Sequence, residues 1–274
     1  MLPPLKYTQL KARDGKRWSL VIDIEGFAAQ ERIDPPQLLG RAMTGIYLLS
    51  EALYKIGTFA YPGDGAINFV DRLFMHQVGD AFIVMGDMWE DDAQRPFLIA
   101  LAVMRFLMSA GIATKAAISS GHWSDIQGLF PEVIRRGSEG GRVSVGHGLM
   151  TTATTMGTAF TRAYKLASRF HGGWLVADED HFTAARALGL NISYRATTAI
   201  GVDWIHSSPS ELAGFCSRAL LPNPTDTEIQ LALDRYMNID PKPPMSWRLG
   251  TAAATGMYPM VPRSFLRRVA GWTQ

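Results

Sequence analysis

The chain has 274 residues, of which 47% are hydrophobic, and a formal net charge of +2. That length allows one large domain, or one domain with an appendage, and the hydrophobic fraction is ordinary for a globular protein with a sizeable core. A charge this close to zero excludes a dedicated nucleic-acid or membrane surface, so we expect neither nucleic acid nor a membrane as partner.

Other features of the composition indicate a soluble cytoplasmic protein. Cys216 is the single cysteine, which excludes an internal disulfide and fits a reducing compartment. Residues 1–6 lack the apolar core of a signal peptide. The longest apolar run, residues 97–108, is interrupted by Arg105 and is too short to span a bilayer.

The first core element is an apolar, β-branched run that begins at Trp18 and ends in an acid. Leu20, Val21 and Ile22 are apolar on both faces, which predicts a buried central strand. A carboxylate at the end of such a strand, Asp23, is unfavourable to bury unless a cation binds it. The alternative is that Asp23 only caps a turn.

A helix and a hairpin follow. Asp34 is the expected N-cap of a helix that ends at Gly57. Residues 66–75 and 81–85 read as a β-hairpin with Gly79–Asp80 at its turn. Two acids at two strand ends, Asp23 and Asp80, can meet around two divalent cations and hold a triphosphate, although Asp80 also suits a plain turn.

The rest of the chain alternates between helix and strand patterns. We expect helices over 93–109, 156–170 and 180–188, strands over 113–120, 142–149, 174–177 and within 192–205, and a loop or short-helix insertion over 122–141. This order predicts an α+β fold, a mixed sheet with helices on one face.

The texture of the sequence changes at residue 206. Prolines recur from there on around one clear helix, residues 226–237. We therefore expect a core domain over 1–205 and a C-terminal extension over 206–274 that packs on the domain or on a partner subunit.

The order of short motifs resembles that of the class III nucleotidyl cyclases. These motifs are Asp23–Ile24–Glu25–Gly26–Phe27, Gly79–Asp80, Ser120–Gly121 and the helix sequence Gly-Thr-Ala-Phe-Thr-Arg-Ala-Tyr-Lys-Leu over 157–166. The resemblance covers roughly residues 15–205, and the first motif is the most specific. It implies the cyclase fold, with a ferredoxin-like core, over the domain 1–205.

The resemblance also implies a two-metal mechanism. In that family two aspartates and a backbone carbonyl bind two Mg²⁺ or Mn²⁺ ions, and these positions match Asp23, Ile24 and Asp80. The turn that cradles the phosphates matches the backbone of Glu25, Gly26 and Phe27. The 3′-hydroxyl of a nucleoside triphosphate attacks the α-phosphorus and pyrophosphate leaves, at a site completed across the interface of a homodimer.

The helix motif departs from the family pattern. The asparagine that orients the ribose falls on Thr161, and the arginine that stabilises charge at the α-phosphate falls on Lys165. A lysine keeps the charge but loses the planar fork of arginine. Thr154, Thr161 and Lys165 share a face if the helix extends back that far, whereas Arg162 should point elsewhere. The alternative is that Thr161 and Lys165 are ordinary solvated residues.

The positions that read the base differ as well. They fall on His76 and Thr154, which match neither the adenine nor the guanine pattern and can each donate or accept a hydrogen bond. This combination resembles the pyrimidine cyclases of the bacterial anti-phage system Pycsar, which make cyclic UMP or cyclic CMP as a second messenger. The alternatives are a purine cyclase with an atypical pocket and an inactive cyclase-like module that binds nucleotide or dimerises.

Overall fold

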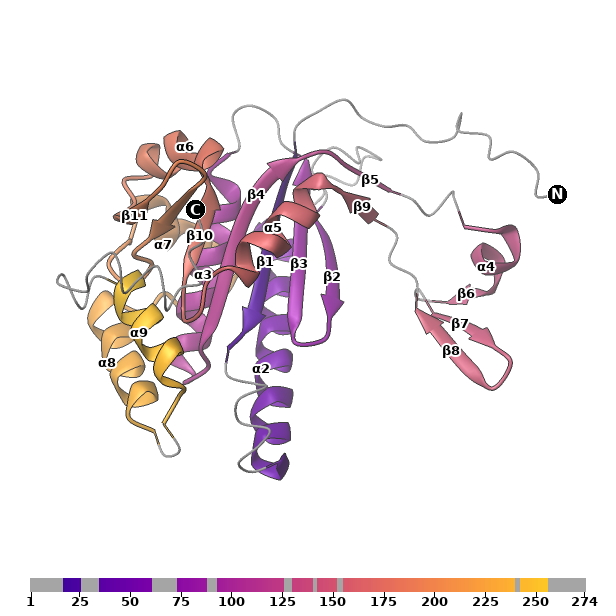
Figure 1. Ribbon diagram of the computed structural model, residues 1–274, viewed down its shortest axis with the longest axis horizontal. Helices are drawn as coiled ribbons and strands as arrows, with labels where there is room; N and C mark the ends of the chain where they lie inside the picture. Colours follow the sequence, from indigo (N-terminus) through magenta and orange to yellow (C-terminus); the bar gives the residue numbers. More distant parts are fainter. Residues whose placement is uncertain are drawn as a thin grey trace.

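The computed structural model describes residues 17–25, 35–60, 73–87, 93–125, 130–139, 142–151, 155–239 and 242–255. Gly26, Phe27, Asp34 and Thr154, which the motifs single out, lie outside these ranges. Figure 1 shows a central sheet with helices on both sides and a small β-structure that stands apart from it.

The central sheet has seven strands in the order β11-β12-β10-β4-β1-β3-β2. Their bounds are β1 (Arg17–Ile24), β2 (Phe74–Val78), β3 (Ala81–Asp87), β4 (Thr114–Gly121), β10 (Leu175–Asp178), β11 (Ile192–Arg195) and β12 (Ala199–Val202). β1 is antiparallel to both β3 and β4, and β10 is parallel to β4, so the sheet is mixed as predicted. A hairpin with Gly79–Asp80 at its turn is confirmed, and Gly79 has a positive φ. Its first strand is Phe74–Val78, and residues 66–72 of the predicted strand lie outside the described ranges.

The helices that pack near this sheet come from the whole length of the chain. They are α2 (Pro35–Lys55) with its π-helical continuation η2 (Ile56–Ala60), α3 (Arg95–Ser109), α5 (Thr158–Ser168), η6 (Glu179–His181), α6 (Phe182–Ala187), α7 (Ser210–Arg218), α8 (Asp226–Met237) and α9 (Met245–Ala254). In the described ranges, none combines the length and the apolar character needed to cross a bilayer.

The insertion between β4 and α5 carries short elements. They are β5 (Trp123–Asp125), α4 (Glu132–Gly137), β6 (Ser138–Glu139), β7 (Arg142–Val145), β8 (Gly148–Thr151) and β9 (Thr155–Gly157). The predicted single strand over 142–149 is therefore wrong, because the chain turns back at Gly146 and pairs β7 with β8.

The helices cover both faces of the sheet, which corrects the prediction that they lie on one. Leu20 and Ile22 of β1 pack with α2 and α3, whereas Val21 packs with the buried residues of α5. Figure 1 shows α5 across the sheet from α3. The physical reason is the run of β1 itself: because successive strand residues point to opposite faces, a strand that is apolar at every position needs cover on both.

The helix predicted from residue 156 begins two residues later, at Thr158. Residues 155–157 instead form β9, which pairs with β5. Helix α5 therefore does not extend back through residues 155–157, and Thr154, which was expected to share a face with Thr161 and Lys165, lies outside the described residues.

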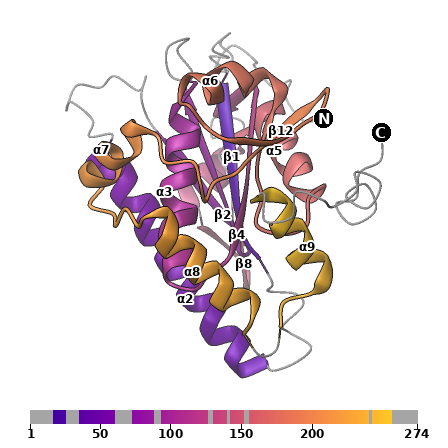
Figure 2. The same cartoon turned by 90° about the vertical axis from the view of Figure 1, so that its left-hand side faces the viewer.

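The C-terminal extension joins the main core. Figure 2 shows α7 and α8 beside α3, and Phe215 and Leu233 belong to the same buried cluster as the apolar face of α3. The helix predicted at 226–237 is confirmed as α8, and a capping box of Thr225 and Glu228 opens it. The boundary at residue 205 stays a prediction.

Candidate functional site

The structure brings Asp23 and Asp80 to the same end of the central strands. Asp23 lies opposite Ala81 of β3, and Asp80 occupies the turn that leads into β3. The backbone N–H of Ile24 donates to the carbonyl of Asp80, with N and O 3.4 Å apart. Two acids that lie 57 positions apart in the sequence are therefore held side by side by strand pairing.

Burial and mutual repulsion make this end of the sheet a site of unfavourable negative charge. The pKa of the Asp80 carboxyl is raised, first by burial and then by the charge of Asp23. Burial also raises the pKa of Glu25, against the opposing effect of Lys115. Carboxylates in such surroundings favour a bound cation, because it stabilises their ionised forms.

Lys115 supplies a positive charge here that the sequence analysis missed. Its Nζ lies 3.1 Å from Oδ2 of Asp23 and 2.7 Å from Oε1 of Glu25. Burial opposes the charge of the lysine, but the two carboxylates outweigh burial and raise its pKa. The available signal was a lone lysine in β4, a strand of small and otherwise buried residues.

The carboxylates fit a hard divalent ion that shares its coordination with substrate. Among the described residues, no group of three or more His, Cys, Asp or Glu side chains is placed to hold a metal by itself. Mg²⁺ is commonly bound by one or two protein carboxylates and completes its shell with water and substrate phosphates. Asp23 and Asp80 meet that requirement. The third expected ligand, the backbone carbonyl of Ile24, belongs to the residue that directly follows Asp23.

Neutralising Asp80 should stabilise the protein without metal. A carboxyl whose folded-state pKa is raised stabilises the fold at low pH, and that contribution is lost as the pH rises through the folded pKa. We expect Asp80→Asn to raise Tm by about 1–2 °C at pH 7.5 in EDTA, the modest size suiting a half-exposed group.

The same comparison at pH 3.5 should show a smaller gain, since the carboxyl is then largely protonated in the folded state and mostly protonated in the unfolded state. Differential scanning calorimetry of the two proteins at both pH values checks this. A Tm that falls at pH 7.5 contradicts the repulsion between the two acids.

The other residues that the family resemblance singles out lie on α5. Thr161 is exposed, and its Oγ1 donates to the carbonyl of Gly157 at 3.1 Å. Lys165 is exposed and lines a cleft of about 380 Å³. In the described part of the chain, no ion pair or hydrogen bond joins Thr161 or Lys165 to Asp23 or Asp80, so one chain holds two separate groups of candidate residues.

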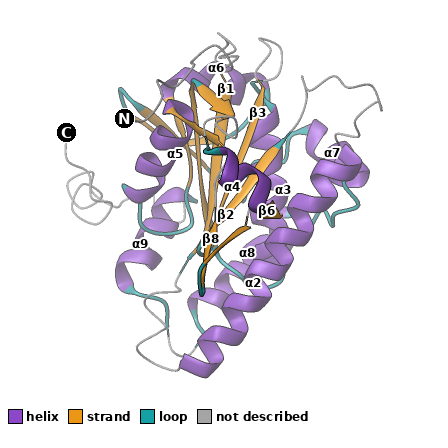
Figure 3. Ribbon diagram, turned by 90° about the vertical axis from the view of Figure 1, so that its right-hand side faces the viewer, coloured by secondary structure: helices purple, strands orange, loops and turns teal. Residues whose placement is uncertain are grey.

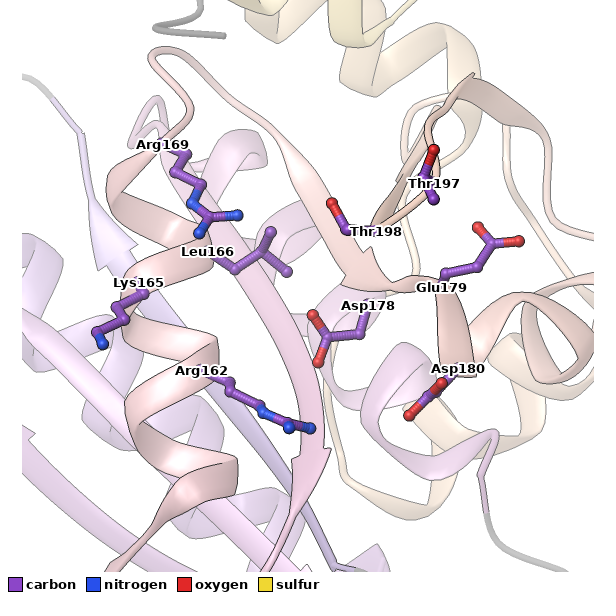
Figure 4. Close-up of a pocket in the computed structure, with 9 residues that line it drawn as sticks. All are labelled: Arg162, Lys165, Leu166, Arg169, Asp178, Glu179, Asp180, Thr197 and Thr198. Carbon is purple, nitrogen blue, oxygen red and sulfur yellow. The ribbon is translucent and has the colours of Figure 1, made fainter. Parts of the chain in front are cut away.

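The cleft lies between α5 and the end of β10, as Figure 4 shows. Arg162 and Lys165 come from α5, Arg169 follows its last residue, and the facing acids are Asp178, Glu179 and Asp180. Arg162 is exposed, and it donates to the carbonyl of Ser120 at 3.3 Å. Figure 4 shows that it extends in a different direction from Lys165.

The close approach of α5 explains why β4 ends in a glycine, Gly121. A Cβ at this position would lie 2.6 Å from Oγ1 of Thr158 and 2.7 Å from the backbone nitrogen of Ala159. The first turn of α5 therefore rests directly on the strand end, and the N–H of His122 donates to Oγ1 of Thr158 at 3.0 Å. This contact sets where α5, with Thr161 and Lys165, crosses the sheet.

Gly121→Ala should destabilise the protein by about 1–3 kcal/mol, because the backbone of Ala159, together with the Thr158 hydroxyl, occupies the space of the new methyl group. Urea unfolding measures the change. Gly40→Ala in α2 is the matched control, since a Cβ there meets nothing within 4 Å. Equal stability of the two variants contradicts the close contact between β4 and α5.

His76 lies on the face of the sheet that carries Asp23. It is opposite Ile83, which is opposite Val21, and directly paired residues share a face. Asp23 follows Val21 by two positions and so points to the same side, as does its own partner Lys115. Figure 3 shows β2 and β3, the last two strands at one edge of the central sheet.

No family model matches the sequence, and no curated protein matches it as a relative. The fold is similar to solved structures of cyclases. The adenylyl cyclase CyaB from P. aeruginosa matches with a TM-score of 0.46 and 14% identity, over 68% of this chain and 93% of that one. The guanylyl cyclase domain of RhoGC from the aquatic fungus Blastocladiella emersonii matches with a TM-score of 0.47 and 13% identity, over 69% of this chain and 94% of that one.

A third match is an adenylate/guanylate cyclase/hydrolase from Silicibacter pomeroyi, with a TM-score of 0.41 and 14% identity, over 68% of this chain and 94% of that one. Likenesses of this size do not say what the chain acts on. Its activity has to be inferred from its own residues.

Proposed function

We propose that the chain is a nucleotide cyclase that converts UTP or CTP into the 3′,5′-cyclic monophosphate and pyrophosphate. The observation that carries the proposal is the meeting of Asp23 and Asp80 at one end of β1 and β3. Phosphoryl transfer from a triphosphate depends on positive charge beside the phosphates, and a pair of adjacent carboxylates is how a protein holds divalent cations there.

Asp23, Asp80 and the Ile24 carbonyl hold two Mn²⁺ or Mg²⁺ ions in this proposal. Such ions, when bound, neutralise triphosphate charge and lower the pKa of the ribose 3′-hydroxyl. The backbone amides of Gly26 and Phe27 donate to phosphate oxygens in this proposal. The Glu25 amide, expected to share this role, is corrected, because its N–H donates to the carbonyl of Ala113 at 2.9 Å. In this proposal His76, which lies on the same face of the sheet as Asp23, reads the edge of the pyrimidine base together with Thr154.

The remaining residues come from a second copy of the chain. Thr161 orients the ribose by its hydroxyl, and Lys165 stabilises the negative charge that develops at the α-phosphate. Both are exposed, and in the described residues neither forms a hydrogen bond or an ion pair with Asp23 or Asp80 of its own chain. This separation supports a two-fold homodimer in which α5 of each chain faces the acids of the other.

The biological role in the proposal is a cytoplasmic second-messenger synthase of bacterial anti-phage defence. Its support is the residues at the base-reading positions, His76 and Thr154, whose resemblance to the Pycsar pyrimidine cyclases is described above. The described helices offer no membrane span, which is compatible with that setting.

The test is incubation of the purified protein with each of the four nucleoside triphosphates and Mn²⁺, with products identified by mass spectrometry. We expect cyclic UMP or cyclic CMP, and a loss of about 10³-fold or more in Asp23→Asn, since the loss of a residue that holds charge beside the reacting phosphate weakens transition-state stabilisation. Glu211→Gln, on the exposed side of α7, is the control and should keep the rate.

The other outcomes separate the alternatives. Cyclic AMP or cyclic GMP as the only product selects a purine cyclase with an atypical pocket. Tight binding of a triphosphate without turnover selects an inactive cyclase-like module, and the absence of both rejects the cyclase reading.

A further inference from the structure

We infer that Lys115 is an internal cation of the acidic site, which limits how tightly the empty site binds divalent metal ions and keeps Glu25 out of the metal shell. The inference rests on the metal-binding part of the proposed function and deepens it. Lys115 is a positioning residue in this scheme, since it acts through Asp23 and Glu25.

Strand pairing fixes the lysine against the first acid. Asp23 and Lys115 are direct partners in the register of β1 and β4, and both point to the face that carries α5. The Lys115 side chain is 16% exposed and that of Glu25 is 11% exposed. The lysine is thus a built part of the site and not a surface side chain that meets the acids by chance.

The ammonium group divides the carboxylates between two tasks. It contacts one oxygen of Asp23, Oδ2, so the carboxylate would keep its other oxygen, Oδ1, available to a metal ion. It also holds Oε1 of Glu25 at 2.7 Å. The Glu25 backbone is fixed as well, because its N–H donates to the carbonyl of Ala113 at 2.9 Å. Glu25 therefore serves as partner of the lysine rather than as a metal ligand.

Charge counting gives the direction of the effect. Asp23, Glu25, Asp80 and Lys115 carry a net charge of −2 when all are ionised, and −3 without the lysine. By Coulomb's law, the repulsion between an ammonium and a divalent ion bound to the same carboxylate is worth about tenfold in affinity or more, even at a water-like dielectric constant. Removal of the ammonium also frees Glu25 as a third carboxylate ligand.

The experiment measures Mn²⁺ binding to the nucleotide-free, full-length protein by the EPR signal of free Mn²⁺. Lys115→Met keeps the length of the side chain and removes its charge, and we expect about tenfold tighter binding or more. The double variant Lys115→Met/Glu25→Gln should return to the wild-type affinity. Lys115→Arg should stay near wild type, as should Lys55→Met, which removes a lysine paired with Glu51 at 2.6 Å on α2.

Glu25→Gln alone provides a second test if Lys115→Met does not fold. It neutralises a buried acid and leaves the ammonium to Asp23 alone, so Mn²⁺ binding should weaken about tenfold. Unchanged or tighter binding in Glu25→Gln overturns the inference, and so does unchanged or weaker binding in Lys115→Met.

The outcomes also separate this inference from the proposed function. A wild-type protein that makes cyclic nucleotide, with no effect of Lys115→Met on Mn²⁺ affinity, overturns only the role of Lys115. Mn²⁺ binding in Lys115→Met but not in wild type supports the internal cation and contradicts the resident metal site. Binding in neither protein overturns the inference.

Discussion

Replacing Arg105 with methionine should lower the free energy of unfolding by about 3–5 kcal/mol, the range for breaking a buried charged network. Arg105 is 1% exposed. Its guanidinium donates to the carbonyls of Trp204 at 3.2 Å and Ile205 at 2.6 Å, and to Pro224 and Asp226 at 2.7 and 2.8 Å. Methionine fills much of the space but leaves these acceptors without a donor.

The loss should appear first in the extension. Arg105 is the point where α3 holds the chain before α7 and the chain before α8, so its removal loosens residues 204–226 together. Urea unfolding measures the free energy, and limited proteolysis should cut the variant within or next to these residues. A first cut in the central sheet, or a change below 1 kcal/mol, contradicts this role.

A surface arginine is the matched control for Arg105. Arg195 pairs with Glu179 at 2.5 Å, but its side chain is 55% exposed. Solvent-exposed pairs contribute about 0.2–1 kcal/mol, and the cation–π contact of Arg195 over the Phe182 ring adds about 0.5–1 kcal/mol, so Arg195→Met should change stability by no more than about 2 kcal/mol. The comparison separates the effect of burial from the effect of removing an arginine.

The pH dependence of the Arg105 variant has a definite sign. Burial works against ionised Asp226, but hydrogen bonds from Ser208 and Arg105 outweigh it and lower the pKa of this carboxyl. A lowered folded pKa gives stability that is present above the unfolded pKa and is lost as the pH falls through the folded pKa. The difference between wild type and variant should therefore shrink in acid, without vanishing, because the carbonyl contacts remain.

Local pattern was enough to predict the elements that carry their own signals. The β1 run, the Gly79–Asp80 hairpin and α8 with its capping box each follow from residues a few positions apart. The missed helices α7 and α9 lack such a signal, since both open after a proline whose side chain cannot cap them. The second layer of helices was implied by β1, which is apolar on both faces.

Only the part of the site that lies at recognisable strand ends could be predicted from the sequence. Asp23 and Asp80 each follow a recognisable strand or turn, so their meeting could be inferred. Lys115 could not, because its partnership with Asp23 depends on the register between β1 and β4, strands that are far apart in the sequence. The same holds for Arg105, whose acceptors lie about one hundred positions further on.

An equimolar mixture of Asp23→Asn and Lys165→Ala chains should recover about a quarter of the wild-type rate, although each variant alone loses about 100-fold or more. Each proposed site takes its carboxylates from one chain and its Lys165 from the other. Random assortment makes half of the dimers mixed, and one of the two sites in a mixed dimer has both parts intact.

The position of Lys165 supports this expectation. Lys165 lies in the cleft beside α5, and in the described residues no ion pair joins it to Asp23 or Asp80 of its own chain. The variants are coexpressed with different affinity tags, and the mixed dimers are isolated through both tags, in which case their rate should be about half of wild type. This design removes slow subunit exchange as a variable.

The matched control is the pair Asp23→Asn and Asp80→Asn. Both changes fall in the same half of the site, so every mixed dimer has both sites damaged and no recovery is expected. Mixed dimers of Asp23→Asn and Lys165→Ala that stay as inactive as the single variants contradict a site shared between chains. Full activity of Lys165→Ala by itself contradicts the role of the lysine, because the charge that develops at the α-phosphate would then be stabilised by other groups.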